Sequence, residues 1–142
     1  MVRTFSTRVV YQGSLGKGEE LIQGLIAVMK ERMIVAGAVT GMGALTEARI
    51  GYFDGRTKKY EEKVFRENME IAALKGNISL KDGQVFPHLH AVLSGRDFSA
   101  VGGHLFSATV YAFEFEITPF EGEPFRRVFD EETGLFLWKE IP

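Results

Sequence analysis

The sequence has 142 residues, of which 45% are hydrophobic, and its formal net charge at pH 7 is −2. This length favours a single domain with enough apolar side chains to fill one core. The near-neutral charge and the lack of a long basic run are not typical of a protein that holds nucleic acid with its own surface. There is no cysteine, which excludes disulfides, thiol nucleophiles and thiolate metal sites and fits a reducing cytoplasm.

The N-terminal residues 1–8 lack the apolar segment of a signal peptide. The longest apolar run is far shorter than the roughly 20 residues that cross a bilayer. We therefore expect a soluble cytoplasmic protein that does not contact a membrane.

Two elements are predicted near the N-terminus, a strand over residues 2–12 and an amphipathic helix over residues 19–32. The apolar residues of the helix recur every three or four positions, as one buried face requires. Glu19 and Glu20 lie at its start, where acidic residues suit the positive end of the helix dipole. This segment is the only one in the sequence with a clear helical pattern.

The rest of the sequence predicts short strands, because β-branched, aromatic and alternating apolar residues are separated by glycine-rich turns. A final hairpin is predicted over residues 128–138. The strands predicted before it are residues 34–39, 45–53, 57–65, 70–80, 85–93 and 109–118.

Glycines lie within or between several of these predicted strands. Gly41 and Gly43 predict a tight backbone bend rather than a phosphate-binding loop, since a strand and not a helix follows them. Gly102 and Gly103 are predicted to let the chain turn or approach another strand closely. Gly76, inside a predicted strand, indicates a bulge or a close-packing point.

These elements predict an α+β fold: a single domain over residues 1–142 in which one helix packs on a twisted antiparallel or mixed sheet of about seven to nine short strands. The helix would cover one face of the sheet, and the other face is rich in aromatic residues. A domain of this size leaves part of such a face uncovered, so we expect the chain to form an oligomer.

All three histidines fall in one short part of the sequence, between Val85 and Phe106. His88 and His90 are two residues apart in a predicted strand, so their side chains point to the same face. His104 follows a glycine pair and can return beside them on a neighbouring strand. Three imidazoles in this arrangement predict a divalent metal site, with Zn²⁺ favoured and other divalent ions as alternatives.

Such a site has one open tetrahedral position, where a bound water reaches a pKa of about 7 and can attack a substrate. Hydrolysis or hydration also needs a general base and residues that orient the ligands. Glu70, Ser94 and Asp97 are the candidates for this surrounding shell or for a pocket beside the metal. The basic pairs Lys58-Lys59 and Arg126-Arg127 are interpreted as solvated surface. The alternative for the histidines is an ordinary structural role in partly buried strands.

Three stretches of the sequence form a recognisable combination. The first is Gly37-Ala-Val-Thr-Gly41-Met-Gly43-Ala-Leu-Thr-Glu-Ala-Arg-Ile-Gly51-Tyr-Phe-Asp54. The second joins His88-Leu-His90 to Leu93-Ser94-Gly95 and to Val101-Gly102-Gly103-His104-Leu105. The third is Phe125-Arg-Arg-Val-Phe-Asp-Glu-Glu-Thr-Gly134-Leu. Together they resemble the plants-and-prokaryotes-conserved (PPC) domain family, in its prokaryotic stand-alone form, over nearly the whole chain.

The resemblance implies an α+β domain with a twisted sheet that assembles as a homotrimer. It also implies a metal ion at His88, His90 and His104, because prokaryotic members carry these histidines. In plant relatives the domain is fused to an AT-hook that binds AT-rich DNA, and the DNA-binding role of prokaryotic relatives descends from that association. This sequence has no Arg-Gly-Arg-Pro hook, so DNA binding rests on the resemblance alone.

Three functions are compatible with these observations. The first is a homotrimeric, zinc-binding domain with a DNA-binding or regulatory role, in which the metal is better supported than the DNA. The second is a small metal-dependent hydrolase or hydratase that uses the open zinc position. The third is a trimeric interaction module in which the metal only stiffens the sheet.

Overall fold

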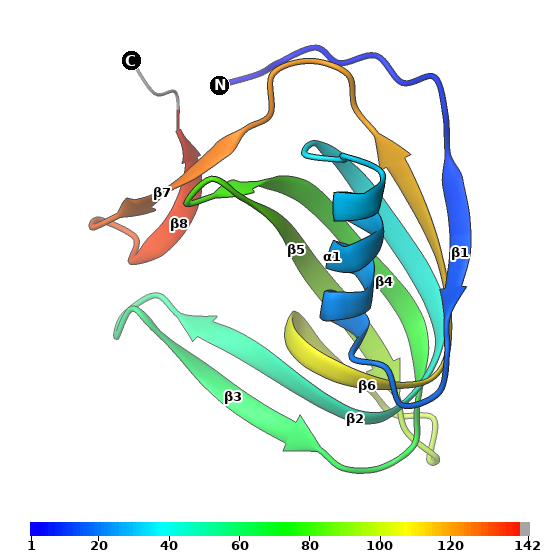
Figure 1. Cartoon of the computed structure of the whole chain (residues 1–142). Helices are drawn as coiled ribbons and strands as arrows, with labels where there is room; N and C mark the ends of the chain where they lie inside the picture. The colour runs from blue at the N-terminus through cyan, green and yellow to red at the C-terminus, as the bar shows by residue number, and fades with distance from the viewer. Residues whose placement is uncertain (140–142) are drawn as a thin grey trace.

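The computed structural model describes residues 1–139, which form eight strands and one helix (Figure 1). The elements are β1 (Tyr11–Leu15), α1 (Leu21–Glu31), β2 (Gly37–Asp54), β3 (Lys59–Phe65), β4 (Met69–Lys81), β5 (Gln84–Ser94), β6 (Ala100–Pro119), β7 (Arg126–Asp130) and β8 (Leu135–Lys139). The α+β prediction is confirmed, and the helix lies within its predicted range. The first strand begins at Tyr11 rather than Val2, because the described residues before it form only an isolated bridge between Ser6 and Glu121.

One sheet contains the eight strands, in the order β3-β2-β6-β5-β4-β7-β8, with β1 beside β6. Strand β2 also pairs with β4, so β2, β6, β5 and β4 form a closed ring. Outside this ring the sheet continues as two arms, the β2–β3 hairpin and the β7–β8 hairpin (Figure 1). Strands β4 and β7 pair in parallel and the other neighbours are antiparallel, which makes the sheet mixed.

Helix α1 is fixed to the sheet by the carboxylate of Glu20. This group accepts hydrogen bonds from the backbone N–H of Gln23 at 2.7 Å and of Ala108 in β6 at 3.0 Å. One side chain therefore satisfies a free N–H of the first helical turn and ties the helix to a strand. The curved sheet surrounds the helix on its concave side (Figure 1). The fully buried helical residues that pack into this core are Leu21, Leu25 and Met29.

No helix among the described residues combines the length and the apolar character that a membrane crossing requires.

Strand β2 passes through its glycine pair without leaving the sheet. It joins two predicted strands, residues 34–39 and 45–53, into one element. The register of β2 against β4 shifts between Gly41 and Gly43, as in a β-bulge. Gly43 has a φ of +140°, and a Cβ there would collide with the carbonyl oxygen of Ala112. The pair therefore bends the strand at a place where only glycine fits.

The second glycine pair lies inside β6, where the chain is extended rather than turned. Gly102 and Gly103 pair with β5, and the turn predicted at this pair falls earlier, at residues 95–99. Gly103 does permit a close approach, because a Cβ there would lie 2.5 Å from the carbonyl oxygen of Gly51 in β2. Glycine suits a strand at such a contact between two backbones.

Gly76 of β4 lies opposite Leu89 of β5, and a Cβ at Gly76 would collide with the carbonyl oxygen of His88. We expect Gly76→Ala to lower the free energy of unfolding by about 1–3 kcal/mol, because an overpacked backbone contact forces the two strands apart. Chemical denaturation measures this change. Gly55→Ala is the control, since nothing lies within 4 Å of a Cβ there. Equal stability of the two variants would contradict the prediction.

Candidate metal centre

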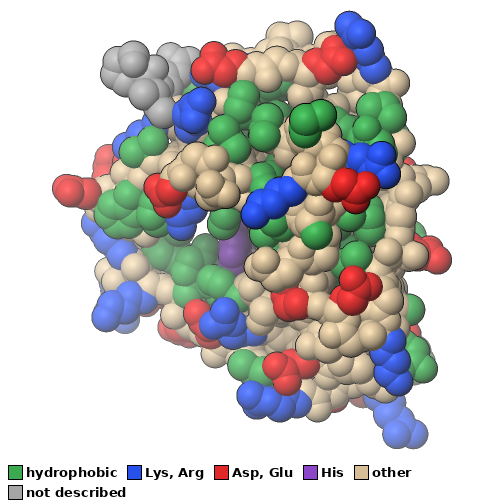
Figure 2. Space-filling model, viewed as in Figure 1, with side chains coloured by type: hydrophobic (Ala, Val, Ile, Leu, Met, Phe, Trp, Pro, Cys, Tyr) green, Lys and Arg blue, Asp and Glu red, His purple; other side chains and the backbone are tan. Residues whose placement is uncertain are grey.

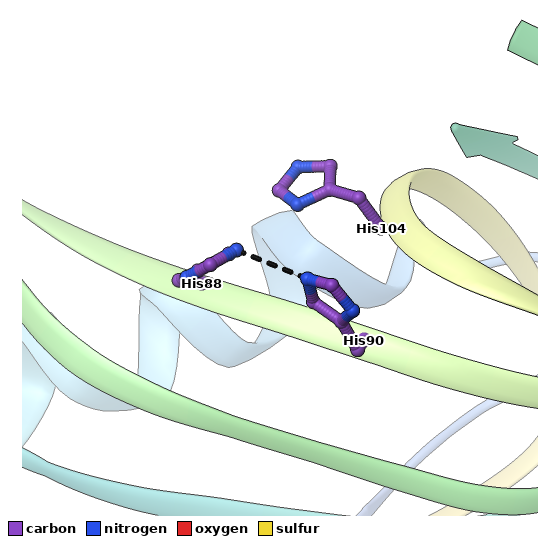
Figure 3. Close-up of side chains that lie close together, drawn as sticks. All are labelled: His88, His90 and His104. Carbon is purple, nitrogen blue, oxygen red and sulfur yellow. Dashed lines mark hydrogen bonds between the residues drawn. The ribbon is translucent and has the colours of Figure 1, made fainter. Parts of the chain in front are cut away.

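Strand β5 directs His88 and His90 away from the core. Along this strand residues 87, 89, 91 and 93 are buried, whereas the two histidines between them are more accessible. This alternation confirms that both histidines share one face, with Leu89 and Ala91 on the other. Leu89 and Ala91 belong to the core that includes the helix. The histidines therefore project from the outer face of the sheet, with α1 behind the strand (Figure 3).

The pairing of β5 with β6 brings the third histidine to the same place. His90 lies directly opposite His104, and the pairing of the two strands ends at this position. From His104 onward β6 continues beside β2. The histidine triad (His88, His90 and His104) thus lies at the point where strands β5 and β6 separate.

The three rings form a compact cluster (Figure 3). The Nε2 atoms of His88 and His90 are 3.3 Å apart. Two nitrogens bound to one tetrahedral zinc ion are separated by about 3.4 Å, given Zn–N bonds of about 2.0–2.1 Å. The ring centroid of His104 lies 5.0 Å from that of His88 and 5.6 Å from that of His90. One ring nitrogen from each histidine lies within 4.8 Å of the others, so the three residues could hold one metal ion.

The triad lies at the bottom of a hollow in the molecular surface, where a histidine is visible between hydrophobic side chains (Figure 2). Tyr60 of β3 and Phe106 of β6 form part of its wall, with ring centroids 5.3 Å and 4.6 Å from that of His104. Burial raises the pKa of Tyr60, while the charge of Arg127 acts in the opposite direction. The aromatic rings of Tyr60 and Phe106 thus give the hollow an apolar wall beside the ring nitrogens of the triad.

Arg127 of β7 brings a positive charge next to the triad. Its Nη2 lies 2.9 Å from the Oδ1 atom of Asn77 and 3.2 Å from Nδ1 of His88. Its Nε donates to the hydroxyl of Ser79 at 2.9 Å, and its Nη1 donates to the carbonyl oxygen of Phe136 at 3.0 Å. Arg127 is half-buried, and all four of these partners are neutral groups.

The environment keeps the rings of His88 and His104 neutral. Burial lowers the pKa of His88 to about 4, and the charges of Arg127 and of the other two histidines act in the same direction. Burial also lowers the pKa of His104 to about 4, with contributions from His90 and Arg127. Both rings are therefore uncharged at pH 7, and a neutral imidazole offers the lone pair that a metal ion requires.

The donor set fits a divalent metal ion. Nδ1 of His104 is buried and has no hydrogen-bond partner in the described chain, an arrangement that is costly unless another group satisfies this atom. The one cluster in residues 1–139 that could hold a metal ion contains three imidazoles and no carboxylate. Imidazole suits Zn²⁺ and other transition metals, whereas Mg²⁺ and Ca²⁺ prefer oxygen ligands. Three imidazoles leave one tetrahedral position for another ligand.

Arg127 determines which nitrogen of His88 carries the ring proton. A guanidinium only donates, so Nδ1 of His88 accepts and the proton resides on Nε2. A metal ion at Nε2 would require that proton to occupy Nδ1 instead. Nδ1 would then no longer accept from Arg127, and one N–H of the guanidinium would become available to another acceptor.

Glu70, Ser94 and Asp97 do not surround the triad. Ser94 is four residues beyond His90 in β5, about 13 Å along the strand, and Glu70 is its partner in β4. Glu70 and Ser94 line a separate surface pocket at that end of the strand. The carboxylate of Asp97 accepts from the hydroxyl and the N–H of Ser99, and these bonds lower its pKa. The expectation of a carboxylate beside the metal is therefore not met by these residues, because the strand carries them away from it.

Three neighbours of the triad were missed in the sequence: Tyr60, Asn77 and Arg127. The interpretation of Arg127 as solvated surface is wrong, since its guanidinium packs beside the His88 ring. Asn77 had a detectable signal, because the two-residue turn at Asp82 and Gly83 fixes which residue of β4 faces His88. Tyr60 and Arg127 reach the site through long-range pairing, for which the sequence has no local signal.

A family model described as the Plants and Prokaryotes Conserved (PCC) domain matches residues 3–121. No curated protein matches the sequence significantly.

Solved structures similar to this chain come from archaea and bacteria. A metal-containing protein from Archaeoglobus fulgidus is 41% identical, with a TM-score of 0.95 and 99% of each chain covered. A plant- and prokaryote-conserved (PPC) protein from Pyrococcus horikoshii is 33% identical, with a TM-score of 0.93, covering 100% of this chain and 99% of the other. A candidate DNA-binding protein from Bacteroides thetaiotaomicron is 34% identical, with a TM-score of 0.85, covering 96% of this chain and 98% of the other.

The lowered pKa values of His88 and His104 predict how the metal-free protein responds to acid. In the unfolded chain both histidines have a pKa near 6.5, against about 4 in the fold. Between these values the unfolded state binds more protons, so this contribution to stability is present above about pH 6.5 and is lost as the pH falls towards 4. We expect the Tm of metal-free protein to fall by several degrees between about pH 7 and pH 5.

The control for this pH effect is the double variant His88→Gln, His104→Gln, which removes both titrating groups. Its Tm should change less with pH over the same interval. An equal slope in the two metal-free proteins would contradict the assignment of this effect to the triad.

Proposed function

The chain belongs to the Plants and Prokaryotes Conserved domain family, and we propose that it binds one divalent metal ion, preferentially Zn²⁺, through His88, His90 and His104. The convergence of three histidine ring nitrogens within 4.8 Å carries this proposal. The name of the similar metal-containing protein from Archaeoglobus fulgidus supports it. Zn²⁺ is favoured because it accepts three imidazoles in a tetrahedral site without needing an oxygen ligand.

We expect purified protein, loaded with Zn²⁺ and freed of excess ion, to retain about one ion per chain by elemental analysis. His88→Ala should retain less than about a tenth of that amount, because losing one of three ligands weakens the site. Val92→Ala is the matched control, since Val92 is accessible on the same face of β5 but lies outside the triad. A wild-type protein that retains no ion, or a His88→Ala variant that retains as much as the wild type, would contradict the proposal.

The same loaded protein also tests whether the metal has a structural role. If the ion stiffens the sheet, chelation should lower the Tm, since a ligand that binds only the folded state stabilises it by mass action. An unchanged Tm after complete removal of the ion would exclude a structural metal.

We propose that the working form is a homotrimer in the cytoplasm, and the trimer is what the resemblance to this family implies. Large apolar side chains on the surface support self-association. Phe98 is 90% exposed, Tyr52 is 70% exposed and Met42 is 63% exposed. The absence of cysteine supports a reducing compartment. Sedimentation velocity of the metal-loaded preparations distinguishes a trimer from a monomer.

A metal-dependent hydrolase or hydratase is the second candidate, because the triad leaves one coordination position open. That chemistry also requires a general base within reach of a metal-bound water. The cluster at the triad contains no carboxylate among residues 1–139, and Glu70 and Asp97 lie elsewhere. Ligand binding at the metal is therefore better supported than hydrolysis.

DNA binding is the third candidate and rests on the name of the Bacteroides thetaiotaomicron relative. The charge of this chain gives it little support, since acidic and basic side chains alternate over the face in Figure 2 and the formal net charge is −2. We expect no mobility shift of AT-rich or mixed-sequence duplex DNA at about 50 mM salt, where electrostatic attraction is strong. A shift at micromolar protein that weakens with salt would establish DNA binding instead.

A further inference from the structure

We infer that the hollow above the triad binds the carboxylate of a small organic acid, between the open position of the metal ion and the guanidinium of Arg127. This inference rests on the proposed metal site and goes beyond it by naming the chemical class of the ligand. It is carried by the charge at the site, by the free donors of Arg127 and by the aromatic walls of the hollow.

The positive charge of Arg127 has no counter-ion in the described chain. Its four hydrogen-bond contacts are to neutral groups, and none of the ion pairs in residues 1–139 includes it. A half-buried charge is costly unless an opposite charge compensates it. A divalent ion on the three imidazoles would add further positive charge a short distance away. An anion is therefore the one component that would balance this site.

Arg127 also has hydrogen-bond donors to offer. A guanidinium has five N–H groups, and four contacts are made here, which leaves one N–H of Nη1 without an acceptor among residues 1–139. A metal ion at Nε2 of His88 would free a second N–H, because a proton on Nδ1 would end the contact with Nη2. These N–H donors suit a carboxylate, whose two oxygens accept hydrogen bonds and bind metals.

The walls of the hollow indicate that the acid has an apolar body. Tyr60 and Phe106 stand beside the triad with their ring centroids 4.9 Å apart. Arg127 itself packs against two further rings, with its guanidinium carbon 5.5 Å from the ring centroid of Phe86 and 5.6 Å from that of Trp138. Inorganic phosphate is hydrated on all sides and gains nothing from such surfaces, whereas an aromatic or aliphatic acid buries its apolar part against them.

Benzoate, benzamide and inorganic phosphate are the probes, and the zinc-loaded protein is the target. Binding is measured by calorimetry and, in a Co²⁺-loaded sample, by the change in the visible absorption of the metal. We expect benzoate to bind and to perturb the cobalt spectrum, with benzamide at least about tenfold weaker, because only the carboxylate balances the charge. Benzamide as tight as benzoate, or phosphate at least as tight, would overturn the inference.

Arg127→Gln tests the guanidinium, and Arg126→Gln is the matched control, since Arg126 is the exposed neighbour on the same strand. We expect benzoate binding to weaken at least about tenfold in Arg127→Gln and to be unchanged in Arg126→Gln. Unchanged binding in an Arg127→Gln protein that holds its metal would overturn the inference. If this variant loses its metal, the comparison of benzoate, benzamide and phosphate on the wild type decides.

Metal content, measured on each sample, separates the two proposals. A wild-type protein that retains no metal contradicts the metal site itself. A wild-type protein that retains one ion per chain and binds no benzoate leaves the metal site intact and overturns the carboxylate site.

Discussion

Strand β5 lies between β4 and β6, and two different constraints fix its register. On one side, the turn at Asp82 and Gly83, both with positive φ, sets Asn77 opposite His88. On the other side, pairing with β6 sets His90 opposite His104 and then ends. A shift of one residue on either side would turn the histidines into the core or separate them. The close contact of Gly76 with β5 adds to this constraint. A shifted register would bring a residue with a side chain to a contact between backbones where only glycine fits.

The site combines a low-dielectric environment with an excess of positive charge. Burial and Arg127 both lower the pKa values of His88 and His104, which prepares the rings for a metal ion by excluding protons. The positive charge of Arg127 also repels a cation, so metal binding at the triad is less favourable than it would be at the same histidines without Arg127. An anionic ligand would resolve this conflict, since it would compensate Arg127 and occupy the open position of a bound metal ion at once. Electrostatics thus links the two binding events, so that each should strengthen the other.

The sequence was sufficient for the parts of the molecule that local patterns control. The helix followed from apolar spacing, and the shared face of His88 and His90 followed from the two-residue period of a strand. Glycine alone was ambiguous, since the same residue that permits a turn also permits two backbones to touch, as Gly103 does against Gly51. Glu70 and Asp97 were candidates by their chemistry alone, because their distance from the triad depends on strand pairing that no local pattern specifies.

Arg127 shows how the two halves of the site arise from different parts of the chain. The three histidines that we propose as metal ligands lie within residues 3–121, which the family model covers, whereas Arg127 belongs to the β7–β8 hairpin beyond that range. This hairpin joins the ring of strands through a short parallel pairing with the end of β4, at Leu80 and Lys81, and through the side-chain contacts of Arg127. Arg127 therefore docks the hairpin and supplies the charge at the hollow. A change in this hairpin would alter the proposed carboxylate site while leaving the three histidines in place, so the residues that the family model covers bear on the proposed metal site more directly than on its ligand.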